Sequence, residues 1–319
     1  MTRSVGIDVG GTKLLGVLVD DDRATEVIRD ARRPTPAGPV ALVEAIEALV
    51  RELEPEPGTP VGVGMPGLVG DDDTFRFGPN LPGVEGLSLG TELGGRLGAP
   101  VVADNDATCA AVAEFRFGAG AGHRDGILLT IGTGIGGGLV VDGEIRHGAH
   151  GFAGEPGHMV VDPAGPRCPC GRRGCWERLA SGSGLGRLGR HAAVAGRLPE
   201  AVALAGGDAE AVRGEHVVAV ARDGSGGAGE VLDDFAWWLA LGIANLVDLL
   251  DPSIVVLGGG VMDAHDVLLD RIDAAVVDEV IGASRRPVVP IAVARAGERA
   301  GAVGAALLAA GEGVLGRSA

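Results

Sequence analysis

The sequence predicts an α/β protein built from two related lobes, and three observations carry this prediction. At 319 residues the chain exceeds the usual domain length of about 100–200 residues. Apolar runs of strand length alternate with longer runs of helical spacing, and glycines cluster where the strand-like runs end. A pattern of strand, glycine turn and strand at residues 4–19 recurs at residues 127–141. Two such units predict two α/β lobes whose glycine turns face each other across a cleft.

The repeat can be written without gaps. Residues 7–10 (Ile-Asp-Val-Gly) lie on residues 129–132 (Leu-Thr-Ile-Gly), and at the same offset residues 16–20 (GVLVD) lie on residues 138–142 (GLVVD). A chance match between two ordinary hairpins is the alternative explanation.

Local signals predict the elements of the first half of the chain. Strands are expected at residues 4–9, 14–19, 60–64 and 100–103, and helices at residues 40–53 and from 104 to about 117. The helix at 40–53 has apolar residues at helical spacing between Pro39 and Pro55. Asp71 to Asp73 are expected in a solvated loop, and Cys109 as a small buried hydrophobic residue.

The second half repeats this alternation. Strands are expected at residues 127–131, 139–141, 253–257 and 288–293, and helices within 179–221, at 231–250, around 266–280 and from about 299 to 310. The helix at 231–250 is long and apolar, so Trp237 and Trp238 are expected in the core. The strand at 253–257 ends in Gly258-Gly259-Gly260, an order that favours a ligand at the carboxyl end of the strand.

Charge and hydropathy exclude several classes of partner. The net charge of −16 argues against a nucleic-acid partner, because such binding depends on cations that neutralise phosphates. No run reaches the about 18 apolar residues that a membrane span needs, and the first apolar segment is too polar for a secretory signal. We therefore expect a cytoplasmic protein without a membrane or nucleic-acid partner.

A cluster of metal-binding residue types occupies residues 154–177. His158, Cys168, Cys170 and Cys175 offer the soft donors and the ligand number of a tetrahedral Cys₃His zinc site. Because all four positions are filled by protein, the predicted Zn²⁺ is structural rather than catalytic. A plain zinc ribbon would explain the cysteines but not the carboxylates on either side of them.

Glycine turns suggest that phosphates bind. Exposed N–H groups in the turns at Gly10-Gly11 and Gly132-Thr133-Gly134 suit phosphate oxygens, although neither turn has the P-loop spacing. Together with the third glycine group at 258–260 they favour a nucleotide. Phosphoryl transfer also needs Mg²⁺ and a residue that orients the acceptor, for which Asp8 and Asp106 are the candidates. Carboxylates at residues 104–106 also suit a helix N-terminus, where capping needs only one of the three residues.

These motifs together resemble the ROK family of sugar kinases and regulators. The resemblance rests on residues 8–13, on Asn105-Asp106-Ala107, on residues 132–138 and above all on the GExGH and CxCGxxGCxE patterns of residues 154–177. Within that family the chain is most similar to the bacterial, actinobacterial-type ATP-dependent glucokinases. The resemblance covers nearly the whole chain. It implies an actin-like, ribonuclease-H-like fold with Mg-ATP in the cleft and transfer of the γ-phosphate to the 6-hydroxyl of glucose.

The resemblance also implies roles for individual residues. Asp106 would be the catalytic base. The sugar would be bound by Gly64, Gly67, Asn80, Asn105, Asp106, Glu155, His158 and Glu177, although turn chemistry alone also explains Asn80. ATP and Mg²⁺ would be bound by Asp8, Gly10, Gly11, Thr12, Lys13, Gly132, Thr133, Gly134, Gly258, Gly259 and Gly260. His158 would serve zinc through one ring nitrogen and the sugar through the other.

The expected lobes are residues 1–118 with about 299–319, and residues 119–298, and we expect a homo-oligomer, either a dimer or a tetramer. N-acetylmannosamine, N-acetylglucosamine or fructose are alternative acceptors, and polyphosphate is an alternative donor. Some relatives are repressors with a helix-turn-helix segment ahead of the sugar domain. The kinase motif begins at Asp8, so we expect no such segment; a sugar-sensing regulator without a DNA-binding domain and a non-catalytic zinc-ribbon module are the non-enzyme alternatives.

Overall fold

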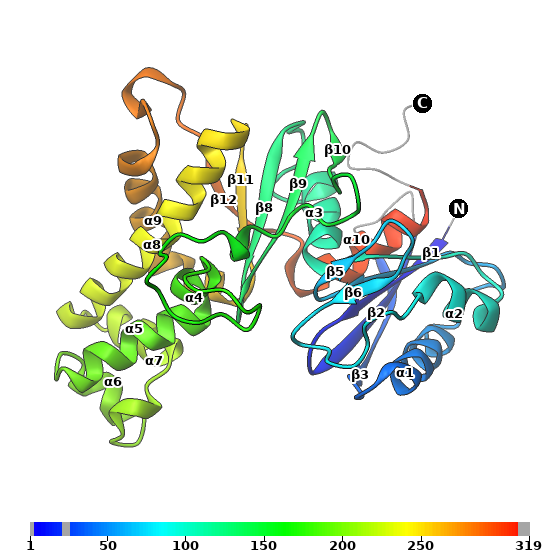
Figure 1. Cartoon of the computed structure of the whole chain (residues 1–319), viewed down its shortest axis with the longest axis horizontal. Coiled ribbons are helices and arrows are strands. Elements are labelled where there is room, and N and C mark those ends of the chain that lie inside the picture. Colours follow the sequence, from blue (N-terminus) through cyan, green and yellow to red (C-terminus); the bar gives the residue numbers. More distant parts are fainter. Residues whose placement is uncertain (1–2, 21–25, 312–319) are drawn as a thin grey trace. The chain divides into compact units, whose positions relative to one another are not determined.

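The computed structural model describes residues 3–20 and 26–311 (Figure 1). Residues 21–25, and the outermost residues of the predicted smaller lobe at 1–2 and 312–319, lie outside the described residues. The chain divides into two compact units. Unit 1 comprises residues 1–128, 137–154 and 294–319, and unit 2 comprises residues 129–136 and 155–293. The lobe boundaries expected near residues 118 and 299 stay a prediction.

A five-stranded sheet in the order β3-β2-β1-β4-β7 runs through unit 1. Its strands are β1 (Arg3–Val9), β2 (Lys13–Asp20), β3 (Val27–Pro34), β4 (Val61–Met65) and β7 (Val101–Asn105). β2 is antiparallel to β1 and β3, whereas β1, β4 and β7 are parallel. The register pairs Asp8 with Gly64, and Met65 with Asn105, so predicted site residues lie together at the carboxyl ends of three neighbouring parallel strands.

Helices cover both faces of this sheet. One core cluster joins apolar residues of the sheet to α1 (Pro39–Glu52) and α2 (Leu89–Leu97). A second cluster joins the opposite face to α3 (Asp106–Phe117) and α10 (Ala300–Ala309). α10 lies so close to the sheet that a Cβ on Gly6 or Gly62 would overlap a carbonyl oxygen of Ala302 or Ala305. This close approach explains why two strand interiors contain glycine.

The second sheet has the order β10-β9-β8-β11-β12. Its strands are β8 (Gly126–Ile131), β9 (Ile135–Val141), β10 (Glu144–Ile145), β11 (Val255–Gly258) and β12 (Ile291–Val293). Numbered within each sheet, both orders read third, second, first, fourth, fifth strand. This agreement supports the internal repeat and confirms the predicted α/β architecture with two related sheets.

Unit 2 also contains most of the helices that the structure describes. They are α4 (Glu177–Ala180), α5 (Gly182–Val194), α6 (Pro199–Leu204), α7 (Gly214–Arg222), α8 (Gly226–Leu250) and α9 (His265–Glu279), with short 3₁₀ turns at Pro156–His158, Ala209–Ala211, Gly260–Ala264 and Ala283–Arg285. A further 3₁₀ turn, Gly297–Arg299, and the small hairpin of β5 (Leu68–Val69) and β6 (Phe75–Phe77) belong to unit 1. α8 packs against α9, α5 and α7. No helix among the described residues is long and apolar enough to cross a membrane.

Several expectations about single elements were wrong. Trp237 is 41% exposed and donates its indole N–H to Glu279, because it lies on the outer side of α8 rather than in the core. The strand expected at residues 288–293 is regular only from Ile291. Asp71 and Asp72 are exposed, as expected, whereas Asp73 is partly buried and accepts a hydrogen bond from the N–H of Ala103 at 2.7 Å. Cys109 is fully buried, as expected.

Candidate active site and metal centre

The junction of β7 and α3 positions the candidate base. The N-cap of α3 is Asn105, whose Oδ1 accepts a hydrogen bond from the N–H of Thr108 at 3.0 Å. Asp106 therefore stands at the first position of the helix rather than serving as its cap. The N-terminus of a helix favours a negative side chain, so this position stabilises the carboxylate form that a base requires.

The same amide of Asn105 also holds the loop that follows β4. Its Nδ2 donates to the carbonyl oxygen of Gly67 at 3.1 Å. Gly67 has φ of +145°, and a Cβ there would overlap the carbonyl group of Phe77, so only glycine fits. A Cβ on Gly64 would lie 3.4 Å from the Cα of Asp106. Unit 1 thus brings the predicted sugar residues Gly64, Gly67, Asn105 and Asp106 together.

Asp104 has a hydrogen-bond partner that the sequence did not predict. Its Oδ2 lies 2.7 Å from Nε2 of His147, and this hydrogen bond raises the pKa of the imidazole above its usual value. The N–H of Ala153 in turn donates to the carbonyl oxygen of His147 at 2.9 Å. The segment that precedes Gly154 is therefore tied to the strand that carries Asn105.

Asp8 and the first glycine turn form the second part of the unit 1 site. The turn is closed by the N–H of Gly10, which donates to the carbonyl oxygen of Lys13 at 2.9 Å. A Cβ on Gly11 would lie 3.6 Å from Cβ of Asn80, which places the predicted sugar residue Asn80 beside this turn. Burial raises the pKa of Asp8 to about 6, and the charge of Lys13 opposes that shift. A cation near this carboxylate would favour its ionised form.

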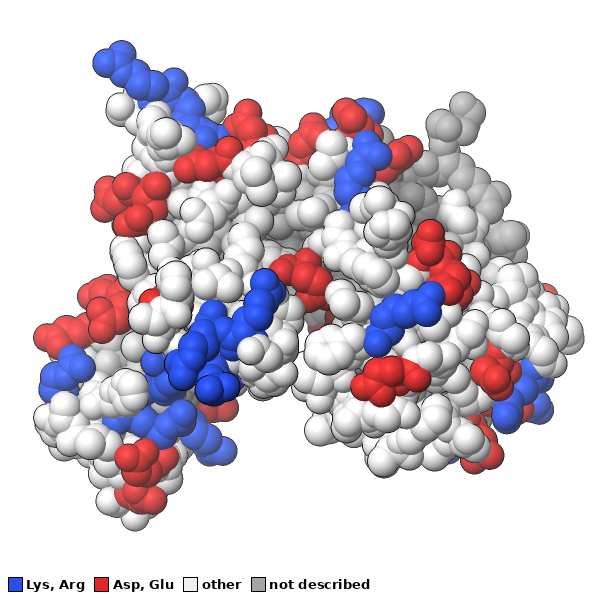
Figure 2. Space-filling view, in the orientation of Figure 1, with Lys and Arg blue, Asp and Glu red and all other residues white. Residues whose placement is uncertain are grey.

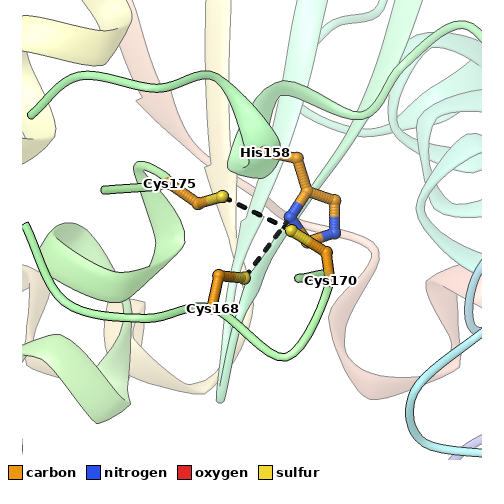
Figure 3. Close-up of side chains that lie close together, drawn as sticks. All are labelled: His158, Cys168, Cys170 and Cys175. Atoms are coloured by element: carbon orange, nitrogen blue, oxygen red, sulfur yellow. Dashed lines mark hydrogen bonds between the residues drawn. The ribbon is translucent and has the colours of Figure 1, made fainter. Parts of the chain in front are cut away.

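The four predicted metal ligands come together in unit 2 (Figure 3). One donor atom from each of His158, Cys168, Cys170 and Cys175 lies within 4.8 Å of the others. Sγ of Cys168 is 3.8 Å from Nδ1 of His158, and Sγ of Cys170 is 3.5 Å from Sγ of Cys175. Zinc–ligand bonds of about 2.0–2.3 Å place the ligands of a tetrahedral site roughly 3.5–3.8 Å apart. The donor set therefore fits Zn²⁺ in both chemistry and spacing.

Tight turns bring these ligands together. Gly171 has φ of +93° and Gly174 φ of +66°, conformations that residues with a side chain rarely adopt. A Cβ on Gly174 would also overlap the carbonyl oxygen of Asp162. The loop is anchored by Trp176, which is fully buried and donates its indole N–H to the carbonyl oxygen of Trp238 at 2.8 Å.

Glu155 and Glu177 lie beside this cluster. Oε1 of Glu177 accepts a hydrogen bond from the thiol of Cys168 at 3.0 Å, a contact with the metal ligands that the sequence did not predict. Burial, and then the charge of Glu177, raise the pKa of Glu155 to about 7. A Cβ on Gly134 would lie within 2.5 Å of Oε2 of Glu177, so the second glycine turn also approaches this carboxylate.

The second glycine turn borders a cavity of about 880 Å³ within unit 2. Gly132, Thr133 and Gly260 line it, together with residues of α4, α5 and α7. Gly259 has φ of +84° and passes so close to the carbonyl oxygen of Ile131 that a Cβ would lie 2.5 Å from it. The structure thus joins the glycines after β11 to those after β8. A cavity of this size and composition is large enough for a nucleotide-sized ligand.

Comparison with known proteins places these features in a family. The sequence profile of the ROK family matches residues 4–312. The chain belongs to the ROK family. Among curated ROK proteins it is 37% identical to the glucokinase of Streptomyces coelicolor over 97% of this chain and 98% of the relative, and 36% identical to the N-acetylmannosamine kinase of Citrobacter koseri over 97% and 99%. Among solved structures, the ROK glucokinase of Streptomyces griseus in complex with glucose and AMPPNP has a TM-score of 0.86 at 37% identity, with 97% of this chain and 99% of that chain covered.

Membership of this family accounts for both the repeated sheets and the metal cluster. Both units have the ROK, actin-like arrangement, and the His/Cys₃ cluster is consistent with the zinc motif of ROK proteins. The curated relatives named here are sugar kinases, among them glucokinases of Streptomyces coelicolor and Thermotoga maritima.

Proposed function

We propose that this protein is an ATP-dependent glucokinase that transfers the γ-phosphate of ATP to the 6-hydroxyl of glucose. The observation that carries the proposal is the position of Asp106, at the start of α3 and beside the loop of Gly64 and Gly67 that Asn105 holds. Similarity to a glucokinase solved with glucose and an ATP analogue supports the choice of both substrates.

Asp106 would orient the 6-hydroxyl and accept its proton as the bond to phosphorus forms. A carboxylate suffices for this task, because the hydroxyl loses its proton late and positioning is the larger contribution. Asn105 already uses Oδ1 for the helix cap and one N–H of Nδ2 for Gly67, so its second N–H is the group left for a sugar hydroxyl.

Glu155, Glu177 and the second ring nitrogen of His158 would bind other hydroxyls of the same sugar. His158 directs Nδ1 towards the cluster, which leaves Nε2 for the substrate. A Zn²⁺ ion held by His158 and the three cysteines would have all its ligands from the protein, and its contribution would be to fix this loop. Asp8 and the two glycine turns would bind Mg-ATP.

An N-acetylhexosamine is the second candidate acceptor. The 36% identity to an N-acetylmannosamine kinase over nearly the full length of both chains supports it. The predicted carboxylates and the metal loop would serve glucose and N-acetylmannosamine alike, so glucose ranks first only because of the likeness to glucokinases.

The test is an ADP-release assay across glucose, mannose, fructose, N-acetylglucosamine and N-acetylmannosamine, with Asp106→Asn as the diagnostic variant. We expect the highest kcat/KM for glucose. The variant should still bind glucose and ATP while its kcat falls by roughly 10²–10⁴-fold. Asp71→Asn removes an exposed carboxylate of the same unit and is the matched control, expected to leave kcat unchanged.

Two outcomes would contradict the proposal. A near-normal kcat in Asp106→Asn would remove this residue from the role of base. A kcat/KM for N-acetylmannosamine that exceeds the value for glucose would reassign the substrate while leaving the proposed chemistry intact.

A further inference from the structure

Asp104 uses both of its carboxylate oxygens to hold neighbouring segments of unit 1. Its Oδ1 accepts a hydrogen bond from the backbone N–H of Asn105 at 2.7 Å, and its Oδ2 lies 2.7 Å from Nε2 of His147. Because an ionised carboxylate only accepts hydrogen bonds, Nε2 is the donor of the second bond. One carboxylate therefore connects the strand end that carries Asn105 to the segment that begins at His147.

This segment forms a closed loop, residues 147–153. The N–H of Ala153 donates to the carbonyl oxygen of His147 at 2.9 Å, so the first and the last residue of the loop are tied together. Gly151, inside the loop, has φ of +86°, and a Cβ there would lie 2.8 Å from the carbonyl oxygen of Val69. The loop is thus attached to unit 1 through the imidazole of His147 and through close packing of its backbone against the end of β5.

The loop ends where the predicted sugar-binding stretch begins. Gly154 follows Ala153, has φ of +97° and lies so close to Gly137 that a Cβ would be 3.0 Å from the carbonyl oxygen of that residue. Glu155, one of the predicted sugar ligands, is the next residue. A shift at the base of the loop would therefore pass through Gly154 to the backbone of Glu155.

The pair of Asp104 and His147 is better shielded than an ordinary surface ion pair. The side chain of Asp104 is 15% exposed and that of His147 41%. A second carboxylate lies nearby: burial raises the pKa of Asp73, and the charge of Asp104 adds to this shift. A shielded carboxylate beside another acidic group needs a cation, and the imidazole, whose pKa this hydrogen bond raises, can supply it.

Histidine suits a positioning role better than the arginines that pair with other acids of unit 1. On the face drawn in Figure 2, acidic and basic side chains are mixed over the part that carries unit 1. Exposed examples are the pairs of Arg76 with Asp72 and of Arg146 with Asp142. A long arginine side chain has many rotamers, so its backbone can move while the ion pair persists. The short, stiff side chain of His147 allows less movement, so its hydrogen bond fixes the backbone that carries it.

We propose that His147 is a positioning residue for the sugar: its hydrogen bond to Asp104 holds the loop 147–153, and with it the backbone that leads into Glu155. The inference rests on the proposed function, since it concerns the binding of the proposed sugar. In this role His147 touches neither the sugar nor the transferred phosphate. Its loss should weaken substrate binding and leave the chemical step almost unchanged.

The test compares replacements of His147 that differ in whether a donor can reach Asp104. The amide N–H of Gln lies about where Nε2 lies in histidine, the amide of Asn is one bond shorter, and Leu has no donor. Calorimetry gives the Kd for glucose, and an ADP-release assay gives KM and kcat. His147→Asn and His147→Leu should raise Kd and KM by roughly 3- to 10-fold, the effect of one hydrogen bond between partly exposed groups. His147→Gln should restore most of the lost affinity.

The split between KM and kcat separates positioning from catalysis. In all three variants kcat should change by less than about 2-fold, because the step proposed for Asp106 does not involve His147. Oδ1 of Asp106 accepts its own hydrogen bond from the N–H of Ala107 at 2.9 Å. His150→Leu is the matched control, because it removes an exposed histidine of the same loop, and it should leave Kd, KM and kcat unchanged.

Hydrogen exchange and thermal unfolding of the unliganded variants test the loop itself. The amide of Ala153 should exchange faster in His147→Asn and His147→Leu than in the parent, and His147→Gln should slow it again. Each variant should keep a Tm close to that of the parent. A Tm that falls together with kcat and affinity would assign His147 to the stability of the fold and overturn the positioning role.

Two further outcomes would overturn the inference. One is a glucose KM in His147→Leu within about 2-fold of the parent value. The other is a His147→Gln variant as weak as His147→Leu, since the donor to Asp104 would then not matter. Calorimetry requires no turnover, so a protein that binds glucose with the expected pattern but does not phosphorylate it would contradict the proposed function alone. An active kinase with normal affinity in every variant would refute the inference alone.

Discussion

Asp8→Asn should stabilise the free protein and abolish its activity. Burial raises the pKa of Asp8 from the ordinary 3.8 to about 6, so the folded state disfavours the carboxylate form. Each pKa unit corresponds to about 1.4 kcal/mol, which gives an upper limit of about 3 kcal/mol for the cost of ionised Asp8 at pH 7. Because part of the side chain is reached by solvent, we expect the variant to gain about 2 kcal/mol.

The sign of the pH dependence follows from the direction of this shift. Below about pH 3.8, Asp8 is protonated in both the folded and the unfolded state, so the variant should gain nothing. The gain should grow as the pH rises from 3.8 to 6 and then stay constant. Urea unfolding of both proteins at pH 4, 5, 6 and 7 measures it. In the parent, kcat/KM for Mg-ATP should fall as the pH drops below about 6, because the protonated carboxyl cannot bind a cation. A variant that is less stable than its parent at pH 7 would refute the reasoning.

Three further substitutions test other parts of the structure. Cys170→Ser should lose zinc, measured by metal analysis, and with it affinity for glucose; unchanged glucose affinity in the metal-free variant would show that the metal does not shape the sugar loop. Glu114→Gln should lower the free energy of unfolding by about 2–4 kcal/mol. The reason is that the buried carboxylate of Glu114 accepts hydrogen bonds from three backbone N–H groups, those of residues 119, 295 and 296. A free energy of unfolding within about 0.5 kcal/mol of the parent value would contradict this. Gly242→Ala should cost about 2 kcal/mol because its Cβ would overlap the ring of Trp176, whereas a gain, as at an ordinary helix glycine, would argue against that packing.

The features that the sequence predicted well are those with local signals. The glycine turns after β1 and β8 interrupt apolar runs, and the ligands of the metal cluster lie within eighteen residues of one another. The end of the long helix at Leu250 was predicted correctly, because Asp251-Pro252 ends it. Its start was not, since the helix begins at Gly226 rather than near residue 231. Such patterns involve only residues that are close together in the sequence, so a single sequence is enough to predict them.

The features that it missed depend on contacts between distant segments. β3 is an edge strand without a fully buried residue, so it lacks the alternation of a half-buried strand. Asp73 is partly buried because β7 passes beside it, and the sequence around residue 73 does not predict that contact. Trp237 is adjacent to a buried stretch of α8, yet its direction around the helix places it outside. The arginines that line the cavity of unit 2 come from α4, α5 and the two ends of α7, and only folding brings these segments together.

Residues 104–106 show how three adjacent polar side chains can serve three purposes. Capping α3 requires one of them, and the structure assigns that task to Asn105. Side chains alternate along a strand, so Asp104, one position earlier, points elsewhere and binds His147. Asp106, one position later, already has the helical conformation and stands at the positive end of the helix dipole. The change from strand to helix thus separates the three directions, and of the two carboxylates it leaves that of the first helical residue, the proposed base, outside the pairing with His147.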